Sequence, residues 1–221
     1  MELLIDSANI NAIKRIASYF PVDGVTTNPT LITKENKPFL SIVKEIRSII
    51  GEESMLHVQV IATDAEEIVR QSVFLANEIG GNFYTKIPVT AEGIKAMKQL
   101  KKEGIGITAT TIYTHLQALT AAKAGAKYLA PYVNRIDNIA GSGAQVVAEI
   151  ARSLELYGYD AKILGASFKN TSQVNEVLLA GAQAITAPPE IIETMIKHPS
   201  TSHDIEQFSD QWKNEFGSLS F

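Results

Sequence analysis

A lysine at the end of a short apolar segment is the residue of this sequence best placed for chemistry. Residues 83–85 favour an extended backbone, and Pro88, which cannot donate to a strand ladder, soon follows Lys86. In a parallel α/β barrel, the carboxyl end of a strand is where an active site is built. Burial disfavours an ammonium, so we expect the pKa of Lys86 to lie below its usual value. A neutral amine can form a Schiff base, whereas a lysine whose head reaches water would have no such role.

Polar side chains stand at the ends of the other predicted strands as well. Arg135 and Ser167 offer a guanidinium fork and a hydroxyl to a phosphate, which barrels of this kind commonly bind near their late strands. In a closed barrel all of these groups would meet Lys86 at one mouth. The full set comprises Asp6, Thr26, Asn28, Gln59, Lys86, Thr110, Tyr132, Arg135 and Ser167.

Three polar segments have a plainer interpretation as helix caps. Residues 26–30 can bind sugar hydroxyls or simply cap a helix. Thr110 and Thr111 can likewise cap a helix or supply a catalytic hydroxyl. Residues 141–143 open a helix and can bind an anion, although Ser142 as an N-cap explains them equally well.

Strand-like and helix-like segments alternate eight times along the chain, with short connections. This pattern predicts an α/β fold, a single (β/α)8 TIM barrel in one domain over residues 1–221, in preference to a doubly wound sheet. An extra C-terminal helix at about 201–221, containing Trp212 and Phe216, has no strand to cover. We expect it to pack on a neighbouring subunit or to fold back on its own barrel.

The expected elements can be given by residue range. The strands are 3–6, 24–26, 55–60, the segment carrying Lys86, 106–110, 128–131, 162–166 and 184–186. The helices are 7–20 with Ser7 as its cap, 37–50, 64–80, 91–103, 112–124, one opening at 143, and 172–179. Residues 132–137 are expected to form a polar loop.

Composition limits the class of protein. The chain has 221 residues, 45% of them hydrophobic, which is enough for one large core. Its net charge of -4 gives no basic stripe for nucleic acid or an anionic membrane, so we expect a small-molecule partner. There is no cysteine, which excludes disulfides, thiolate zinc sites and cysteine nucleophiles. The N-terminal residues resemble neither a signal peptide nor a membrane span, and we expect a soluble cytoplasmic protein.

Side chains of two kinds alternate along residues 55–60. The apolar residues at even positions suit packing under outer helices, so His57 and Gln59 are expected to point into the barrel, where they need partners. His57 is interpreted as a hydrogen-bonded interior histidine rather than a metal ligand. The reason is that no second ligand stands at metal spacing and the other histidines are scattered.

Five segments, taken together and in order, resemble those of a known family. They are 24–29 (GVTTNP), 58–60 (VQV), 86–93 (KIPVTAEG), 130–137 (APYVNRID) and 166–169 (ASFK). Over nearly its whole length the chain resembles the small transaldolase-like class I aldolases, most closely the fructose-6-phosphate aldolases. The resemblance implies reversible cleavage of fructose 6-phosphate to dihydroxyacetone and glyceraldehyde 3-phosphate, with no metal or cofactor. The alternative is a transaldolase that transfers a dihydroxyacetone unit between sugar phosphates of the pentose phosphate pathway.

The same resemblance implies a role for each polar strand end. Lys86 would capture the ketose carbonyl as a Schiff base, and Asp6 would orient the lysine and assist proton transfers. Tyr132 would act as general acid and base through a water that it holds with Gln59 and Thr110. Substrate binding would fall to Thr26, Asn28, Arg135 and Ser167, the last two at the phosphate.

Two positions bear on the choice between the activities. Transaldolases of this family usually carry Glu where Gln59 stands and Phe where Tyr132 stands, so both positions favour the aldolase. His57 and Ala109 depart from the family pattern, in which an apolar or aromatic residue and a glycine are usual, and they could alter donor preference.

Other functions fit the sequence less well. A sugar-phosphate binding protein without turnover is the outside alternative. A phosphosugar isomerase would want a carboxylate base at a strand end, and only Asp6 is so placed. The resemblance also implies a homo-oligomer, a decamer of two pentamers tied together by the C-terminal helices.

Overall fold

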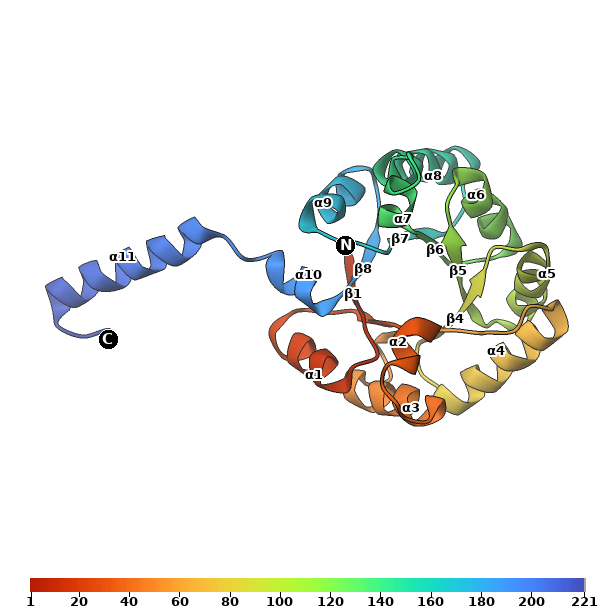
Figure 1. The fold of residues 1–221 in the computed structure, drawn as a ribbon, viewed down its shortest axis with the longest axis horizontal. Coiled ribbons are helices and arrows are strands. Elements are labelled where there is room, and N and C mark those ends of the chain that lie inside the picture. Colours follow the sequence, from red (N-terminus) through yellow and green to blue (C-terminus); the bar gives the residue numbers. More distant parts are fainter. Residues whose placement is uncertain (221) are drawn as a thin grey trace.

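The computed structural model describes residues 1–220, and its strands close into a barrel, seen as a ring in Figure 1. Neighbouring strands are parallel and follow one another in sequence order, and the first pairs with the last to complete the ring. The strands are β1 (Glu2–Asp6), β2 (Gly24–Thr26), β3 (Met55–Gln59), β4 (Phe83–Pro88), β5 (Gly106–Ile112), β6 (Tyr128–Pro131), β7 (Lys162–Gly165) and β8 (Ala184–Ala187). The predicted TIM barrel is confirmed.

Most helices of the structure lie around the outside of this barrel, and the last one projects away from it (Figure 1). They are α1 (Ile10–Tyr19), α2 (Pro29–Thr33), α3 (Phe39–Ile50), α4 (Ala65–Ile79), α5 (Ala91–Leu100), α6 (His115–Ala124), α7 (Val133–Asp137), α8 (Gly143–Tyr157), α9 (Thr171–Leu179), α10 (Pro189–Thr194) and α11 (Pro199–Phe216), with a short 3-10 turn η1 (Lys101–Glu103) after α5. The short helices α2 and α7 lie in the loops that follow β2 and β6. Within residues 1–220, no helix combines the length and the apolar character needed to cross a membrane.

The alternation along β3 shows how the strands divide the core. Leu56 and Val58 are fully buried in the main core between strands and helices. Met55 faces the other way, into a second apolar cluster that it shares with Leu4, Tyr128, Leu164 and Ala184. These apolar side chains fill part of the barrel interior, and the polar strand-end side chains lie toward the carboxyl ends of the strands.

The structure tests two predicted caps, Ser7 and Ser142. Oδ1 of Asn9 accepts a hydrogen bond from the backbone N–H of Ala12 at 2.9 Å, so Asn9 caps α1 and the expectation of Ser7 as the cap is wrong. Oγ of Ser142 accepts from the backbone N–H of Gln145 at 3.2 Å. The cap interpretation of residues 141–143 therefore holds.

The segment after β5 differs most from expectation. The strand runs on to Ile112, where a helix was expected, and α6 begins only after Thr114, which forms a capping box with Gln117. Residues 110–111 therefore belong to the strand and do not cap α6. Residues 132–137, expected to be a loop, contain the short helix α7.

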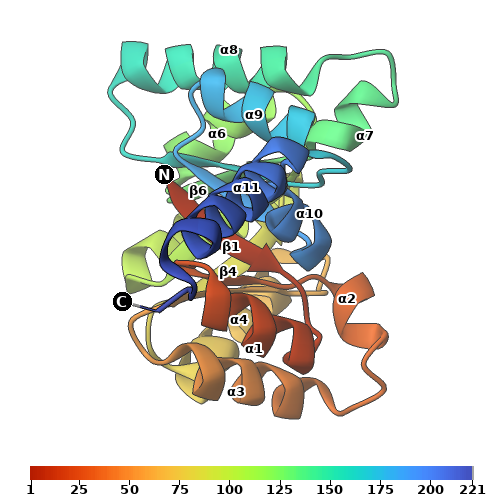
Figure 2. The ribbon, with the colours of Figure 1, turned by 90° about the vertical axis from the view of Figure 1, so that its left-hand side faces the viewer.

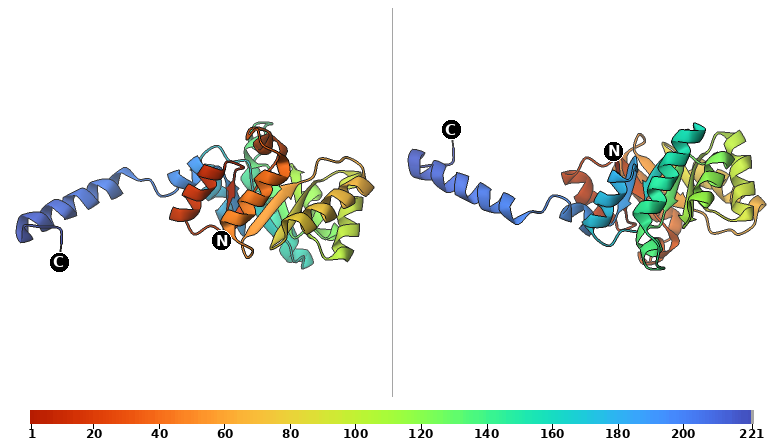
Figure 3. Two further views of the ribbon diagram at one scale, coloured as in Figure 1. Left: turned by 90° about the horizontal axis from the view of Figure 1, so that it is seen from below. Right: turned by 90° about the horizontal axis from the view of Figure 1, so that it is seen from above.

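Helix α11 projects away from the barrel, as Figure 1 and both views of Figure 3 show, and in Figure 2 it lies in front of the barrel. None of its residues is buried, and Ile205, Phe208 and Phe216 are exposed. The predicted extra helix is confirmed, with its start at Pro199, and it does not fold back on its own barrel. Position 221 of the predicted range lies outside the described residues.

Candidate active site

Lys86 on β4 reaches the interior of the barrel. Its register neighbours are Gln59 on β3 and Thr108 on β5. The residue is only 5% exposed, and Nζ donates a hydrogen bond to the backbone oxygen of Thr27 at 2.7 Å. Burial lowers the pKa of Lys86, and the charge of Asp6 opposes this effect only in part. An amine of this kind is suited to attack on a carbonyl.

Asp6 is the last residue of β1, and its carboxylate interacts electrostatically with the Lys86 amine. Its Oδ1 accepts a hydrogen bond from the hydroxyl of Thr26 at 2.8 Å. Burial raises the pKa of Asp6, although the charge of Lys86 and the bond from Thr26 act in the opposite direction. The pKa values of Asp6 and Lys86 thus shift toward each other, which makes proton exchange between them easier than in water.

Tyr132 follows β6 and faces the same space. Its hydroxyl lies 3.0 Å from the hydroxyl of Thr110. Burial raises the pKa of Tyr132, whereas the bond to Thr110 and the charge of Arg135 lower it in part. The phenol therefore keeps its proton at neutral pH and can serve as an acid.

Arg135, in α7, stacks on Tyr132. Its guanidinium carbon lies 4.7 Å from the centre of the Tyr132 ring, a cation–π geometry. A hydrogen bond to Tyr113 raises the pKa of Arg135. The guanidinium is thus held at the rim as a permanent cation, suited to a phosphate.

A cavity of about 290 Å³ joins these groups. Asn28 lies on its wall, and Oδ1 of the same residue caps α2 by accepting a hydrogen bond from the backbone N–H of Leu31 at 3.1 Å. The cap interpretation of this turn therefore holds, and its binding of sugar hydroxyls stays a prediction. The predicted site residues that line the cavity are Asp6, Asn28, Gln59, Lys86, Tyr132, Arg135 and Ser167.

Thr26 and Thr110 do not line this cavity. Both residues are fully buried. Thr26 bonds to Asp6 and lies 2.6 Å from the hydroxyl of Thr186, and Thr110 supports Tyr132. The hydroxyl of Thr26 is therefore used within the barrel wall, where it bonds to Asp6, and contact between Thr26 and substrate stays a prediction.

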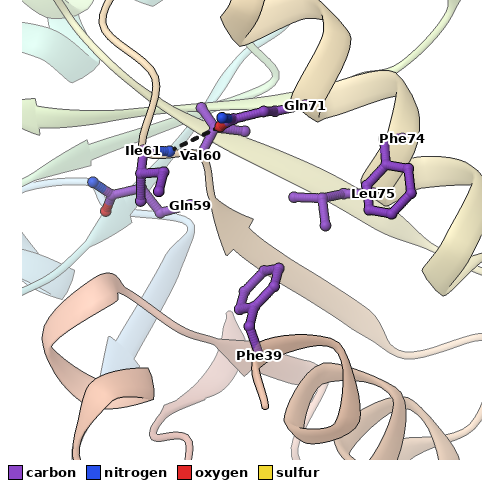
Figure 4. Close-up of a pocket in the computed structure, with 7 residues that line it drawn as sticks. All are labelled: Phe39, Gln59, Val60, Ile61, Gln71, Phe74 and Leu75. Atoms are coloured by element: carbon purple, nitrogen blue, oxygen red, sulfur yellow. Dashed lines mark hydrogen bonds between the residues drawn. The ribbon is translucent and has the colours of Figure 1, made fainter.

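Gln59 separates the polar cavity from an apolar one. The apolar cavity, of about 250 Å³, is lined mainly by Phe39, Ile61, Phe74 and Leu75, and Figure 4 shows the Gln59 amide turned away from Phe74 and Leu75. Oε1 of Gln59 is buried and has no hydrogen-bond partner among residues 1–220. It can therefore accept a hydrogen bond from a ligand or a water in the polar cavity.

His57 lies inside the barrel, fully buried. Its Nδ1 is 2.7 Å from the hydroxyl of Thr108, and its ring stacks on that of Tyr84 with centroids 4.7 Å apart. Burial and the nearby charge of Lys86 lower the pKa of His57 well below its usual value, so the imidazole is neutral. No group of three or more His, Asp or Glu side chains within residues 1–220 is placed to hold a metal ion. The prediction of a hydrogen-bonded interior histidine is confirmed.

Sequence reasoning did not assign several residues that line the cavity. Thr186 stands one residue before the end of β8 and could have been found by the strand-end rule that found the others. Thr111, considered from the sequence as a helix cap or a catalytic hydroxyl, also lines the cavity, although strict alternation along β5 would turn its side chain away from the barrel interior.

Comparison with known proteins agrees with this geometry. A solved structure described as "Native KDPGal structure" superimposes with a TM-score of 0.59 at 15% sequence identity, over 85% of this chain and 82% of that chain. At this identity the likeness supports the fold alone. A family model described as "Transaldolase/Fructose-6-phosphate aldolase" matches residues 3–219. With nearly its whole length matched, and with the amine, carboxylate and phenol gathered in one cavity, the chain belongs to the transaldolase/fructose-6-phosphate aldolase family, and it is an enzyme of the aldolase or transaldolase type.

Proposed function

We propose that this protein is a class I aldolase that reversibly cleaves fructose 6-phosphate to dihydroxyacetone and glyceraldehyde 3-phosphate through a Schiff base on Lys86. The observation that carries the proposal is the pairing of a buried amine of lowered pKa with a carboxylate of raised pKa in one cavity. Such a pair supplies both a nucleophile and a proton acceptor near neutral pH.

The first half of the reaction builds the electron sink. The neutral Nζ of Lys86 attacks the C2 carbonyl of the ketose and forms a carbinolamine. The hydroxyl at C2 takes a proton and leaves as water, which gives the protonated imine. Asp6 and Tyr132 are the proposed proton carriers, because each lines the cavity and has a raised pKa.

In the second half the carbon–carbon bond breaks. A base removes the proton of the C4 hydroxyl, the C3–C4 electron pair moves to the imine, and glyceraldehyde 3-phosphate departs. The enamine then takes a proton at C3, and water hydrolyses the imine to release dihydroxyacetone. We assign the protonation at C3 to Tyr132, acting through a water that Oε1 of Gln59 helps to hold.

The phosphate is assigned to the opposite end of the cavity. Arg135 offers a cation with several donors, and Ser167 offers a hydroxyl and a backbone amide. Ser167 has a φ of 65°, an uncommon conformation for a residue with a Cβ, and such conformations gather at ligand sites.

Transaldolase activity is the second candidate, because the description of the matching family names both activities. A phenol at position 132 favours protonation of the enamine and release of free dihydroxyacetone. If free dihydroxyacetone forms from fructose 6-phosphate without an added acceptor, the aldolase assignment stands. Transfer to an added aldehyde without such release would favour the transaldolase.

Covalent trapping tests the Schiff base directly. The protein is incubated with fructose 6-phosphate or dihydroxyacetone and borohydride, and its peptides are mapped by mass. A reduced adduct on Lys86 is expected in the native protein and in a Lys162→Met control, which alters the opposite end of the barrel, but not in Lys86→Met. A folded protein with no adduct on any lysine would favour a sugar-phosphate binding protein.

We also propose a homo-oligomer assembled through α11. This helix exposes Ile205, Phe208 and Phe216, and none of its residues is buried. An amphipathic helix that leaves large apolar side chains in solvent gains stability by packing on a second copy of the chain.

A further inference from the structure

Strand β5 carries an irregularity beside the cavity. Its pairing with β6 shifts register between Ala109 and Ile112. Thr111 lies within this shift and has a φ of 56°, a left-handed conformation that β-branched residues rarely adopt. A register shift with one strained residue describes a β-bulge, in which one extra residue is inserted into a strand.

The bulge changes which side chains face the cavity. Ala109 and Ile112 are both fully buried in the outer core, although they stand three positions apart rather than two or four. One residue has thus been inserted between them. As a result, Thr110 reaches Tyr132 and its direct neighbour Thr111 lines the cavity, an arrangement that regular alternation forbids.

Backbone strain is concentrated at this cavity. Two residues with positive φ other than glycine, Asn36 and Ala140, lie in exposed loops. The other two among residues 1–220, Thr111 and Ser167, both line the cavity. Strained backbone conformations of this kind are common at ligand sites.

The hydroxyl of Thr111 is oriented. It donates its hydrogen to the backbone oxygen of Thr110 at 2.6 Å. Because that hydrogen is used, the oxygen presents lone pairs to the cavity and acts as a hydrogen-bond acceptor. An acceptor of this kind fits a hydroxyl of a sugar.

The position of Thr111 indicates which hydroxyl of the substrate it contacts. β5 lies between β4, which carries Lys86, and β6, which leads to Arg135. A phosphosugar held at C2 by Lys86 and at its phosphate by Arg135 passes the end of β5 with its middle carbons. We propose that Thr111 is a specificity-determining residue that accepts a hydrogen bond from a hydroxyl of the half that leaves as the aldehyde; this rests on the proposed aldolase function.

Two acceptor aldehydes test the proposal, glyceraldehyde 3-phosphate and 3-oxopropyl phosphate, which lacks the 2-hydroxyl. Aldol addition of dihydroxyacetone to each is followed in the wild-type protein, Thr111→Val and Thr111→Ser. We expect Thr111→Val to lower kcat/KM for glyceraldehyde 3-phosphate by about fivefold to tenfold and to leave the value for 3-oxopropyl phosphate within about twofold. Thr111→Ser keeps the hydroxyl and should keep the selectivity.

A glycine variant separates the effect of losing the hydroxyl from an effect of lower stability. Glycine adopts positive φ without strain, so Thr111→Gly should melt at a higher temperature and show the same loss of selectivity. Equal losses for both acceptors, or unchanged selectivity in the Val and Gly variants, would overturn the proposal. Trapping of dihydroxyacetone on Lys86 should be the same in all of these proteins, because dihydroxyacetone lacks the hydroxyl concerned. Failure to trap it in the wild-type protein would instead overturn the proposed function, and this inference with it.

Discussion

The hydroxyl of Thr26 lies 2.8 Å from Oδ1 of Asp6, its register partner on the neighbouring strand. A hydrogen bond to a carboxylate favours the ionised form, so it opposes the burial that raises the pKa of Asp6. Thr26→Val should therefore raise the pKa of Asp6 further. The ionised carboxylate is the proton acceptor. On acidification, the Thr26→Val variant should therefore lose activity at a higher pH than the wild-type protein does. The acid limb of kcat/KM should move upward by about one pH unit.

Thr26→Ser is the matched control. It retains the hydroxyl and removes only a methyl group, so its pH profile should stay close to that of the wild-type protein. An acid limb that does not move in the Val variant would show that the bond to Thr26 does not tune Asp6.

The phenol of Tyr132 provides a second prediction. Burial raises its pKa, so it holds a proton at neutral pH and can pass one toward the enamine. Tyr132→Phe should lower release of free dihydroxyacetone by about a hundredfold and lower transfer to an added aldehyde by much less. Both products are measured in one reaction mixture. Thr110→Val, which removes only the hydroxyl that bonds to Tyr132, should show the same trend more weakly. If release and transfer fall by the same factor, Tyr132 does not select between them.

The buried amine makes stability depend on pH. The pKa of Lys86 is lower in the folded chain than its usual 10.5, so between these two values the unfolded chain binds more protons. The free energy of unfolding must therefore rise with pH across that window, by about 1.4 kcal/mol for each pH unit. Lys86→Met lacks this contribution. The stability of the wild-type protein relative to Lys86→Met should increase as the pH approaches 10.5.

Urea unfolding at a series of pH values measures this difference. Lys162→Met is the control. A hydrogen bond to Glu2 raises the pKa of Lys162 above its usual 10.5. The stability that this bond adds is therefore lost only as the pH rises above 10.5. Its difference from the wild-type protein should stay flat below that pH. A flat difference for Lys86→Met as well would mean that the pKa of its amine is not depressed in the folded state.

The strands, the helices and the inward faces of the strands could be predicted, because each depends on the order of side chains within a short segment. The alternation around His57 and Gln59 identified the inward face of β3, and the regular exchange of strand and helix predicted the closed barrel. Lys86 could be placed because a parallel barrel gathers strand ends at one mouth. These inferences need only the order of side chains along the chain.

What could not be predicted depends on contacts between strands or on a local irregularity. Thr26 was expected at the substrate, yet its hydroxyl meets Asp6 and Thr186, which only the register and closure of the barrel bring together. The inward direction of Thr111 could not be predicted, because nothing in the sequence marks the bulge that turns its side chain toward the cavity. No residue of α11 is buried, so the burial patterns that predict the other helices do not predict its direction.

The proposed assembly through α11 leads to a prediction about size in solution. A chain truncated before Pro199 removes the whole helix and leaves the barrel elements intact. We expect the full chain to form an oligomer and the truncated chain to give a smaller assembly or a monomer in light scattering. A monomeric full chain, or a truncated chain of unchanged assembly state, would refute the proposal.

His57 and Thr108 form a buried pair, in which Nδ1 and Oγ1 lie 2.7 Å apart. Removing either partner leaves the other buried and unsatisfied, so His57→Phe and Thr108→Leu should each lower the free energy of unfolding by about 1–3 kcal/mol. The double variant removes both polar groups and keeps an aromatic ring against Tyr84. It should therefore be less destabilised than the sum of the single variants by about 1 kcal/mol or more, as measured by urea unfolding. If all three variants are still trapped by dihydroxyacetone on Lys86, the pair supports the barrel rather than the chemistry. Additive losses would mean that the two side chains do not depend on each other.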